Sequence, residues 1–160
     1  MGSGKSILGK QLASRLLLKL VDLDDCIVAQ AGKPIPDIFE DEGELTFRVL
    51  ETKALKDALQ SDQDSIVSTG GGAILSPQNR ALMKAHGQVV WLDAPAKVLA
   101  ERISGDSNRP LLNNVDPLQK MEFLMQQRNP LYAEIANLRV DTDKLSDKEA
   151  VDKIIYFLSE

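Results

Sequence analysis

Two spacings of hydrophobic residues alternate along the chain, one typical of helices and one typical of buried strands. Between residues 5 and 19, Leu8, Leu12 and Leu16 recur every four positions, which indicates a helix with one apolar face. Short apolar runs that predict strands separate this stretch from further helical ones. We predict strands over 20–24, 65–69, 88–93 and 139–141, and helices over 5–19, from the first strand to Gly32, and over 36–60, 76–87, 95–103, 117–137 and 146–158.

Cap and turn residues mark the ends of several of these helices. Gly32 and Gly87 follow helical stretches, where glycine commonly ends a helix. Ser76 stands before a proline, and Ser146 stands three residues before a glutamate, which is capping-box spacing. Gly43 interrupts the longest helical region. We therefore expect helix boundaries at these positions.

One segment has no hydrophobic period. Residues 104–116 (SGDSNRPLLNNVD) are polar and contain glycine and asparagine, so we predict a mobile loop that could act as a lid. The helical stretch 117–137 follows, and we expect Pro130 to break or kink it.

The order of strands and helices favours an α/β fold. Strands that are separated by helices form a parallel sheet with helices on both faces. Such sheets bind ligands beyond the carboxyl ends of their strands. Asp22, Asp24, the glycines at 70–72 and Asp93 all stand at predicted strand ends.

Composition and charge exclude several classes of function. The chain has 160 residues, 43% of them hydrophobic and 27% charged, which suits one globular domain. Its net charge is −5 with no basic block, so we expect no nucleic-acid partner. No segment approaches the ~20 apolar residues of a membrane span, and there is no signal-peptide pattern.

The cysteine and histidine content limits the disulfides and metal sites that the chain can form. Cys26 is the only cysteine, so an internal disulfide is impossible, which fits a reducing cytoplasm. His86 is the only histidine, and one cysteine with one histidine cannot make a tetrahedral protein site, so we expect no zinc.

The first six residues, MGSGKS, match the end of the phosphate-binding pattern G-x-x-x-x-G-K-[ST]. In that pattern the backbone amides of Gly2, Ser3 and Gly4 would surround phosphate oxygens, Lys5 would reach the β/γ-phosphates, and Ser6 would bind Mg²⁺. A flexible start followed by a helix is the alternative. The first glycine of the pattern, and the strand that precedes such a loop, would lie before the first residue.

Two acids follow the first predicted strand. Asp22 and Asp24 are two residues apart, so on a strand both would lie on one side. Beside a nucleotide, one could hold Mg²⁺ through water and the other could accept a hydroxyl proton. Alternatively, Asp24 or Asp25 caps the next helix.

Gly70, Gly71 and Gly72 follow the second predicted strand. Three successive glycines permit either a close approach of backbone and ligand or a tight turn.

Four arginines complete the set of candidates. Arg48 lies in LTFRVLE, Arg102 and Arg109 flank or occupy the polar loop, and Arg128 precedes NPLY. Surface arginines are usually only solvated, but guanidinium groups also suit carboxylate and phosphate oxygens.

Taken together, these motifs resemble the shikimate kinase family. The chain contains GSGKS, VDLDDCI, IPDIFEDEGELTFRVLE, STGGGAI, NRPLL and RNPLYAEIA in the family's order and at similar spacings, from Met1 to about Asp143. The resemblance implies ATP-dependent phosphorylation of the 3-hydroxyl of shikimate, in the pathway to aromatic amino acids.

The resemblance also implies roles for residues around ATP. Lys5 matches the lysine of the phosphate loop, Ser6 the magnesium-binding hydroxyl, and Asp22 an acid near the metal. Arg109 matches the lid arginine that reaches the transferring phosphate, and Arg102 is similar to an arginine that packs near adenine.

On the shikimate side, Asp24 matches the acid that contacts the substrate hydroxyls and could accept the 3-hydroxyl proton. Arg48 and Arg128 match the pair that binds the substrate carboxylate, and the glycines 70–72 match the triplet that lines the ring.

The family fold is a P-loop NTPase-type parallel sheet between helices, with five strands when complete. We expect a single kinase domain over 1–160, with its shikimate-binding helical region at about 24–60 and its first strand absent from the printed chain. We further expect a cytoplasmic monomer that binds ATP, Mg²⁺ and shikimate. A gluconate kinase-like enzyme, or an inactive binding module if the front of the chain is lost, are the alternatives.

Overall fold

The computed structural model of this chain describes residues 2–104 and 116–160. They form two compact units, which are described separately here: Gly9–Gln88, and the residues up to Leu8 together with Val89–Glu160. The predicted loop lies outside the described residues except for its two ends. No helix within the described ranges is long and apolar enough to cross a membrane. The single kinase domain stays a prediction.

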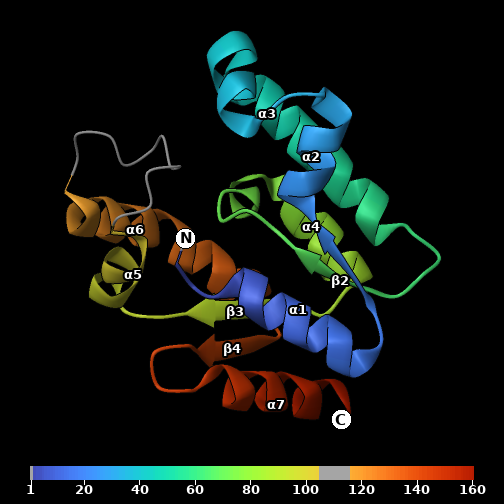
Figure 1. Cartoon of the computed structure of the whole chain (residues 1–160), viewed down its shortest axis with the longest axis vertical. Coiled ribbons are helices and arrows are strands. Elements are labelled where there is room, and N and C mark those ends of the chain that lie inside the picture. The colour runs from blue at the N-terminus through green and yellow to red at the C-terminus, as the bar shows by residue number, and fades with distance from the viewer. Residues whose placement is uncertain (1, 105–115) are drawn as a thin grey trace. The chain divides into compact units, whose positions relative to one another are not determined.

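The unit Gly9–Gln88 is built around two parallel strands (Figure 1). Its elements in chain order are the end of α1 (Lys5–Leu16), β1 (Lys19–Asp22), α2 (Leu23–Ala31), α3 (Ile35–Leu59), β2 (Ser65–Ser68), the 3-10 turn η1 (Ala73–Leu75) and α4 (Pro77–His86). The two helices between the strands form the crossover that parallel pairing requires. Leu23 and Ile27 of α2 and Ile38 and Leu55 of α3 have no exposed surface, so these helices supply the core of the unit.

The second unit also contains one parallel pair. Its elements are the start of α1, β3 (Val90–Asp93), α5 (Ala96–Ile103), α6 (Pro117–Ile135), β4 (Leu138–Asp141) and α7 (Asp147–Leu158). Helix α7 packs beside β4 (Figure 1). A cluster of buried side chains joins α5 to α6, and it contains Ala94, Leu99, Ala100, Ile103 and Met121.

The predicted caps are confirmed. Gly32 ends α2 in the left-handed conformation (φ 71°), and its N–H donates to the carbonyl of Val28. The Ser76 side chain accepts from the N–H of Asn79 at the start of α4. Ser146 and Glu149 form the capping box of α7.

The parallel α/β architecture is likewise confirmed, whereas several boundaries were wrong. The strand predicted over 20–24 ends at Asp22, because the side chain of this residue caps α2 and Leu23 is already helical. Helix α1 ends at Leu16, since Leu17 adopts the left-handed region (φ 56°) and turns the chain toward β1. Helix α6 continues through Pro130 without a break.

The described residues contain four strands in two pairs. The predicted fifth strand would precede the printed sequence, and it stays a prediction.

Gly43 divides α3 into two helical segments. Its backbone (φ 81°, ψ 170°) lies in a region that only glycine adopts readily, which confirms the predicted interruption. The rings of Phe39 and Phe47, one from each segment, are 4.7 Å apart between centroids. Side-chain packing therefore joins the two segments where the helix is interrupted.

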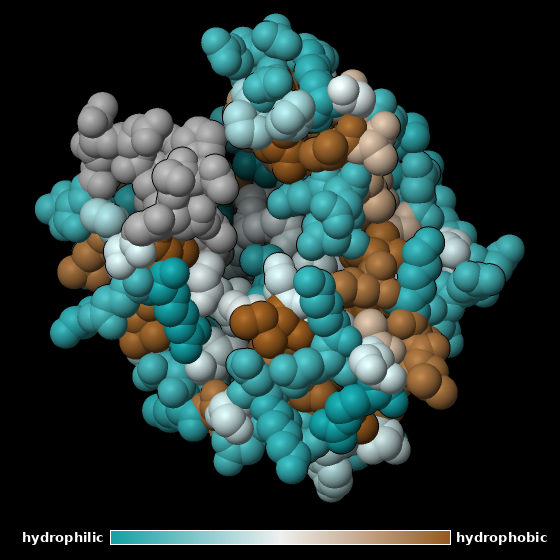
Figure 2. Space-filling model, in the orientation of Figure 1, coloured by the Kyte–Doolittle hydropathy of each residue, from teal (hydrophilic) through white to brown (hydrophobic). Residues whose placement is uncertain are grey.

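The exposed large hydrophobic side chains come from many different elements. Hydrophilic residues cover most of the face shown in Figure 2, and the hydrophobic ones form separate patches. Scattered exposed hydrophobic residues are normal on protein surfaces. Those with the largest exposed fractions are Leu17, Leu45, Val49 and Tyr156.

Substitution of Gly43 by alanine should destabilise the protein through the backbone alone, because a Cβ at this position would meet no atom within 4 Å. We expect the free energy of unfolding to fall by about 1–3 kcal/mol, the cost of a non-glycine residue in this conformation. Gly87→Ala is the matched control, since Gly87 is extended (φ −165°) and its surroundings are equally open. Denaturant unfolding measures both variants, and equal effects would contradict the assignment.

Candidate active site

The predicted phosphate loop turns directly into α1. Gly2 (φ 69°) and Gly4 (φ 87°) both adopt the left-handed region, and Lys5 is the first residue of the helix. The carbonyl of Gly4 accepts the N–H of Leu8 at 3.0 Å, so the loop continues into the helical hydrogen bonds. A helix N-terminus with glycines before it presents backbone N–H groups that suit an anion. The geometry therefore agrees with a phosphate loop.

The start of this loop packs on α5. A Cβ on Gly2 would lie 3.0 Å from the carbonyl oxygen of Leu99 and 3.1 Å from Ile103. Arg102 of the same helix donates to the carbonyl of Gly2 at 3.2 Å. The same guanidinium donates to the hydroxyl of Thr142 at 3.1 Å and to its carbonyl at 2.8 Å. Arg102 therefore joins two backbone segments, while its predicted place near adenine stays untested.

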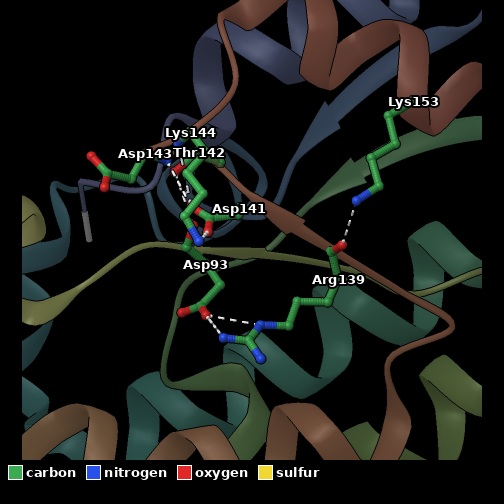
Figure 3. A network of polar contacts seen from close by, with 7 residues as sticks. All are labelled: Asp93, Arg139, Asp141, Thr142, Asp143, Lys144 and Lys153. Atoms are coloured by element: carbon green, nitrogen blue, oxygen red, sulfur yellow. Dashed lines mark hydrogen bonds and ion pairs between the residues drawn. The ribbon is translucent and has the colours of Figure 1, made fainter.

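Asp93, at the carboxyl end of β3, is occupied by structural contacts (Figure 3). Its carboxylate accepts from Arg139, with a distance of 2.9 Å to Nε, and this guanidinium lies 4.8 Å from the ring centroid of Trp91. The backbone carbonyl of Asp93 accepts the N–H of Thr142 at 2.8 Å. These contacts fix the segment that follows β4.

In the other unit, the prediction that Asp22 and Asp24 lie on one strand is wrong. Asp22 is the last residue of β1, and its Oδ1 accepts the backbone N–H of Asp24 at 3.0 Å. Asp24 belongs to the first turn of α2 and is exposed. An acid does cap α2, but it is Asp22 and not Asp24 or Asp25 as the alternative had it. The cap fixes the backbone of Asp24.

The glycine triplet lies where side chains approach the backbone closely. A Cβ on Gly70 would lie 3.3 Å from Oε1 of Glu51 and 3.7 Å from Oδ1 of Asp24. A Cβ on Gly72 would lie 2.6 Å from both terminal nitrogens of Arg48. A Cβ at position 72 would force the Arg48 side chain to move, whereas one at position 70 would need only a small shift of Glu51. This unit therefore places Asp24 beside Gly70 and Arg48 beside Gly72.

Glu51 is the residue that the sequence interpretation missed. Its side chain is 2% exposed and accepts from Nη1 of Arg48 at 2.8 Å, while the exposed Glu44 accepts from Nη2 at 3.2 Å. Burial alone would lower the pKa of Arg48, and the bonds to Glu51 and Glu44 outweigh burial and raise it. The spacing FRVLE, with an acid three residues after the arginine, was the available signal.

Arg128 has a different environment on α6. Its Nε is buried and has no hydrogen-bond partner in the described part of the chain. Burial raises the pKa of Tyr132, one turn later, although the charge of Arg128 and a hydrogen bond from it act in the opposite direction. Trp91 stacks on Tyr132 with 5.6 Å between ring centroids. Burial therefore favours the uncharged form of the Tyr132 phenol beside the guanidinium of Arg128.

The remaining predicted site residues can be placed only in part. Arg109 and the body of the lid (105–115) lie outside the described residues. Within the described ranges, no group of three or more His, Cys, Asp or Glu side chains could hold a metal ion. The predicted ligands Ser6 and Asp22 belong to different units, and each is described only within its own unit.

The buried pair Arg48–Glu51 should contribute more to stability than the exposed pair Arg48–Glu44. A hydrogen bond to a charged group contributes about 1.5–3 kcal/mol, whereas an exposed ion pair contributes about 0.2–1 kcal/mol. We expect Glu51→Gln to lower the free energy of unfolding by about 1–3 kcal/mol, and Glu44→Gln, its matched control, to change it by less than about 1 kcal/mol. Urea unfolding of both variants checks this, and a smaller effect at Glu51 would disprove the ranking.

Comparison with known proteins identifies the family. The shikimate kinase family model matches residues 1–159. The chain is 42% identical over 159 residues to the shikimate kinase of Xanthomonas euvesicatoria pv. vesicatoria, covering 99% of this chain and 88% of the relative. It is 43% identical over 160 residues to that of Francisella tularensis subsp. holarctica, covering 100% and 91%.

A solved structure agrees with these relatives. The shikimate kinase from Acinetobacter baumannii in complex with shikimate matches with a TM-score of 0.93 and 37% identity, covering 99% of this chain and 88% of that one. The fold is therefore the P-loop NTPase-type α/β fold, as predicted, and the chain belongs to the shikimate kinase family.

Proposed function

We propose that this chain transfers the γ-phosphoryl group of ATP to the 3-hydroxyl of shikimate, giving shikimate 3-phosphate and ADP. The observation that carries the proposal is the family match over residues 1–159, which includes every predicted site residue. In the reaction, the 3-hydroxyl oxygen forms a bond to the γ-phosphorus, and the bond from that phosphorus to the β-phosphate oxygen breaks. The hydroxyl proton must then pass to a base.

ATP binds through the phosphate loop in this proposal. The backbone amides of Gly2, Ser3 and Gly4 surround the phosphates, and Lys5 places a positive charge beside the β/γ-phosphates. Arg109 of the predicted lid reaches the transferring group. Positive charge at these places is most valuable in the transition state, where negative charge spreads over the γ-phosphoryl oxygens.

Kinases of this family use ATP, generally together with Mg²⁺. The hydroxyl of Ser6 and the carboxylate of Asp22 are hard oxygen donors of the kind that Mg²⁺ prefers, and such sites take only one or two protein ligands beside substrate phosphates and water. Asp22 uses Oδ1 to cap α2, so Oδ2 is the oxygen for a water-mediated contact. When bound, the ion would neutralise charge on the β- and γ-phosphates.

Asp24 is the proposed contact to the substrate hydroxyls and the acceptor of the 3-hydroxyl proton. The cap by Asp22 fixes its backbone, and the glycine at position 70 leaves room beside its carboxylate. A base that is held in place near its proton can act without first reorganising its surroundings.

Arg48 and Arg128 are the proposed ligands of the shikimate carboxylate, with Gly70, Gly71 and Gly72 along the ring. Glu51 supports this role for Arg48, because it holds one edge of the guanidinium against the glycine turn. The buried Nε of Arg128 supports the second contact, because an acceptor would satisfy it. The cytoplasmic location and the monomeric state stay predictions.

Turnover with shikimate tests the function directly. Purified protein with ATP and Mg²⁺ should release ADP when shikimate is added, and gluconate should not replace it. ADP release with gluconate alone would favour a gluconate kinase-like enzyme. If ATP and shikimate bind without turnover, the chain is an inactive binding module.

Asp24→Asn should lower turnover at saturating shikimate by roughly 10²–10⁴-fold, the usual contribution of general acid–base catalysis. ATP affinity should stay within about twofold of the parent, because Asp24 has no proposed contact with ATP. Asp25→Asn is the matched control, since the neighbouring acid on the same helical turn is also exposed. Steady-state kinetics measure both variants, and half the parental turnover in Asp24→Asn would remove this residue from the mechanism.

Arg48→Lys and Arg128→Lys should each weaken shikimate binding by roughly 10- to 150-fold and leave ATP affinity unchanged. Lysine keeps the charge but loses the planar fork, whose charge-assisted bonds contribute about 1.5–3 kcal/mol. The double mutant should cost less than the sum of the single mutants, because both arginines serve one carboxylate. Calorimetric titration checks this, with Arg15→Lys on α1 as control. Parental affinity in both single mutants would disprove the shared carboxylate.

A further inference from the structure

Arg102 donates three hydrogen bonds to two backbone segments that lie 140 residues apart in sequence. Its acceptors are the carbonyl of Gly2, at 3.2 Å, and the hydroxyl and carbonyl of Thr142, at 3.1 and 2.8 Å. All three acceptors are neutral oxygens, so these bonds leave the charge of the guanidinium uncompensated. An arginine that only packs against a nucleobase would not need them.

The Thr142 end of this connection is firmly held. The N–H and the hydroxyl of Thr142 both donate to the carbonyl of Asp93, at 2.8 and 3.1 Å. Asp141, the residue before it, accepts the N–H of Asp143 at 3.1 Å and pairs with Lys144 at 3.1 Å (Figure 3). The segment after β4 is thus tied both to the end of β3 and to itself, and it offers Arg102 a fixed support.

The Gly2 end determines the direction of one loop amide. In a trans peptide, the C=O of one residue and the N–H of the next point in opposite directions from the same plane. No cis peptide occurs among the described residues. A bond that holds the carbonyl of Gly2 toward Arg102 therefore turns the N–H of Ser3 away from it. Helix α5 also leaves no room for a side chain at position 2, since a Cβ on Gly2 would lie 3.0 Å from the carbonyl oxygen of Leu99.

We propose that Arg102 is a positioning residue for the phosphate loop: supported by Thr142, it fixes the Gly2–Ser3 peptide so that the Ser3 amide faces a bound polyphosphate. The inference rests on the proposed function for the identity of this loop. It assigns Thr142, which need not touch the nucleotide, a role in phosphate affinity. The proposal also predicts that Arg102 contributes to the binding of the triphosphate even when no base is present.

The test compares ATP with a ligand that has no base. Calorimetry measures the affinity of the full chain for ATP and for inorganic tripolyphosphate, both with Mg²⁺. The variants are Thr142→Val, which removes one hydroxyl without changing charge, and Arg102→Lys, which keeps the charge but cannot reach both segments. Lys97→Met is the matched control, because Lys97 is an exposed cation on the same helix.

We expect Arg102→Lys to weaken both ligands by the same factor, roughly 5- to 20-fold, and Thr142→Val to weaken both by roughly 2- to 5-fold. The KM for shikimate should not change in either variant, and Lys97→Met should bind both ligands like the parent. A loss of stability alone would not give this pattern, and thermal unfolding of each variant is measured beside it. If Arg102→Lys does not fold, Thr142→Val decides the question.

Losses confined to ATP would overturn the proposal, because they would show that Arg102 serves the base only. A parent chain that does not bind tripolyphosphate would overturn it as well. Failure of the proposed function looks different: tripolyphosphate then binds with the expected losses in the variants, but shikimate causes no ADP release.

Discussion

Within each unit, backbone hydrogen bonds between two parallel strands determine where the segments that carry the candidate site residues begin. In one pair Asp22 lies opposite Ser68, and in the other Asp93 lies opposite Asp141. Within each pair, the two segments that follow the strands therefore start at the same edge of that pair. In one unit these segments are the first turn of α2 and the glycine turn; in the other they are the start of α5 and the turn at Thr142. Strands of four residues suffice, because the helices between them supply the buried surface.

The two arginines with a proposed role at the carboxylate differ in their electrostatics. Arg48 already contacts two glutamates, one of them buried, so part of its hydrogen-bonding capacity is used before any substrate arrives. Arg128 contacts a phenol that burial keeps neutral, and one of its buried N–H groups has no acceptor in the described residues. Glu51 thus orients the Arg48 guanidinium, whereas the Nε of Arg128 is buried and, within the described residues, has no hydrogen-bond acceptor.

The sequence predicted what depends on local chemistry. Gly32, Ser76 and Ser146 act on the backbone within a few residues, and their caps were foreseen. The end of β1 was misplaced because Asp22 suits a strand end and a helix cap equally well, and only the fold decides between them. Pro130 was expected to break or kink α6; the helix does not break there, because packing of the surrounding turns outweighs the loss of one hydrogen bond. Glu51 was missed because an arginine and a glutamate three residues apart are equally typical of a solvated ion pair on a helix surface, and the sequence does not show that Glu51 is buried.

The break at Gly43 has a consequence for how the family can vary. Because the backbone of Gly43 is not helical, regular helix geometry does not set the angle between the two segments of α3, and the packed rings of Phe39 and Phe47 help to hold it. The guanidinium of Arg48 lies 5.2 Å from the Phe47 ring centroid. A smaller side chain at Phe39 should therefore act on the direction of the first segment, while Arg48 and Glu51 keep their places on the second segment.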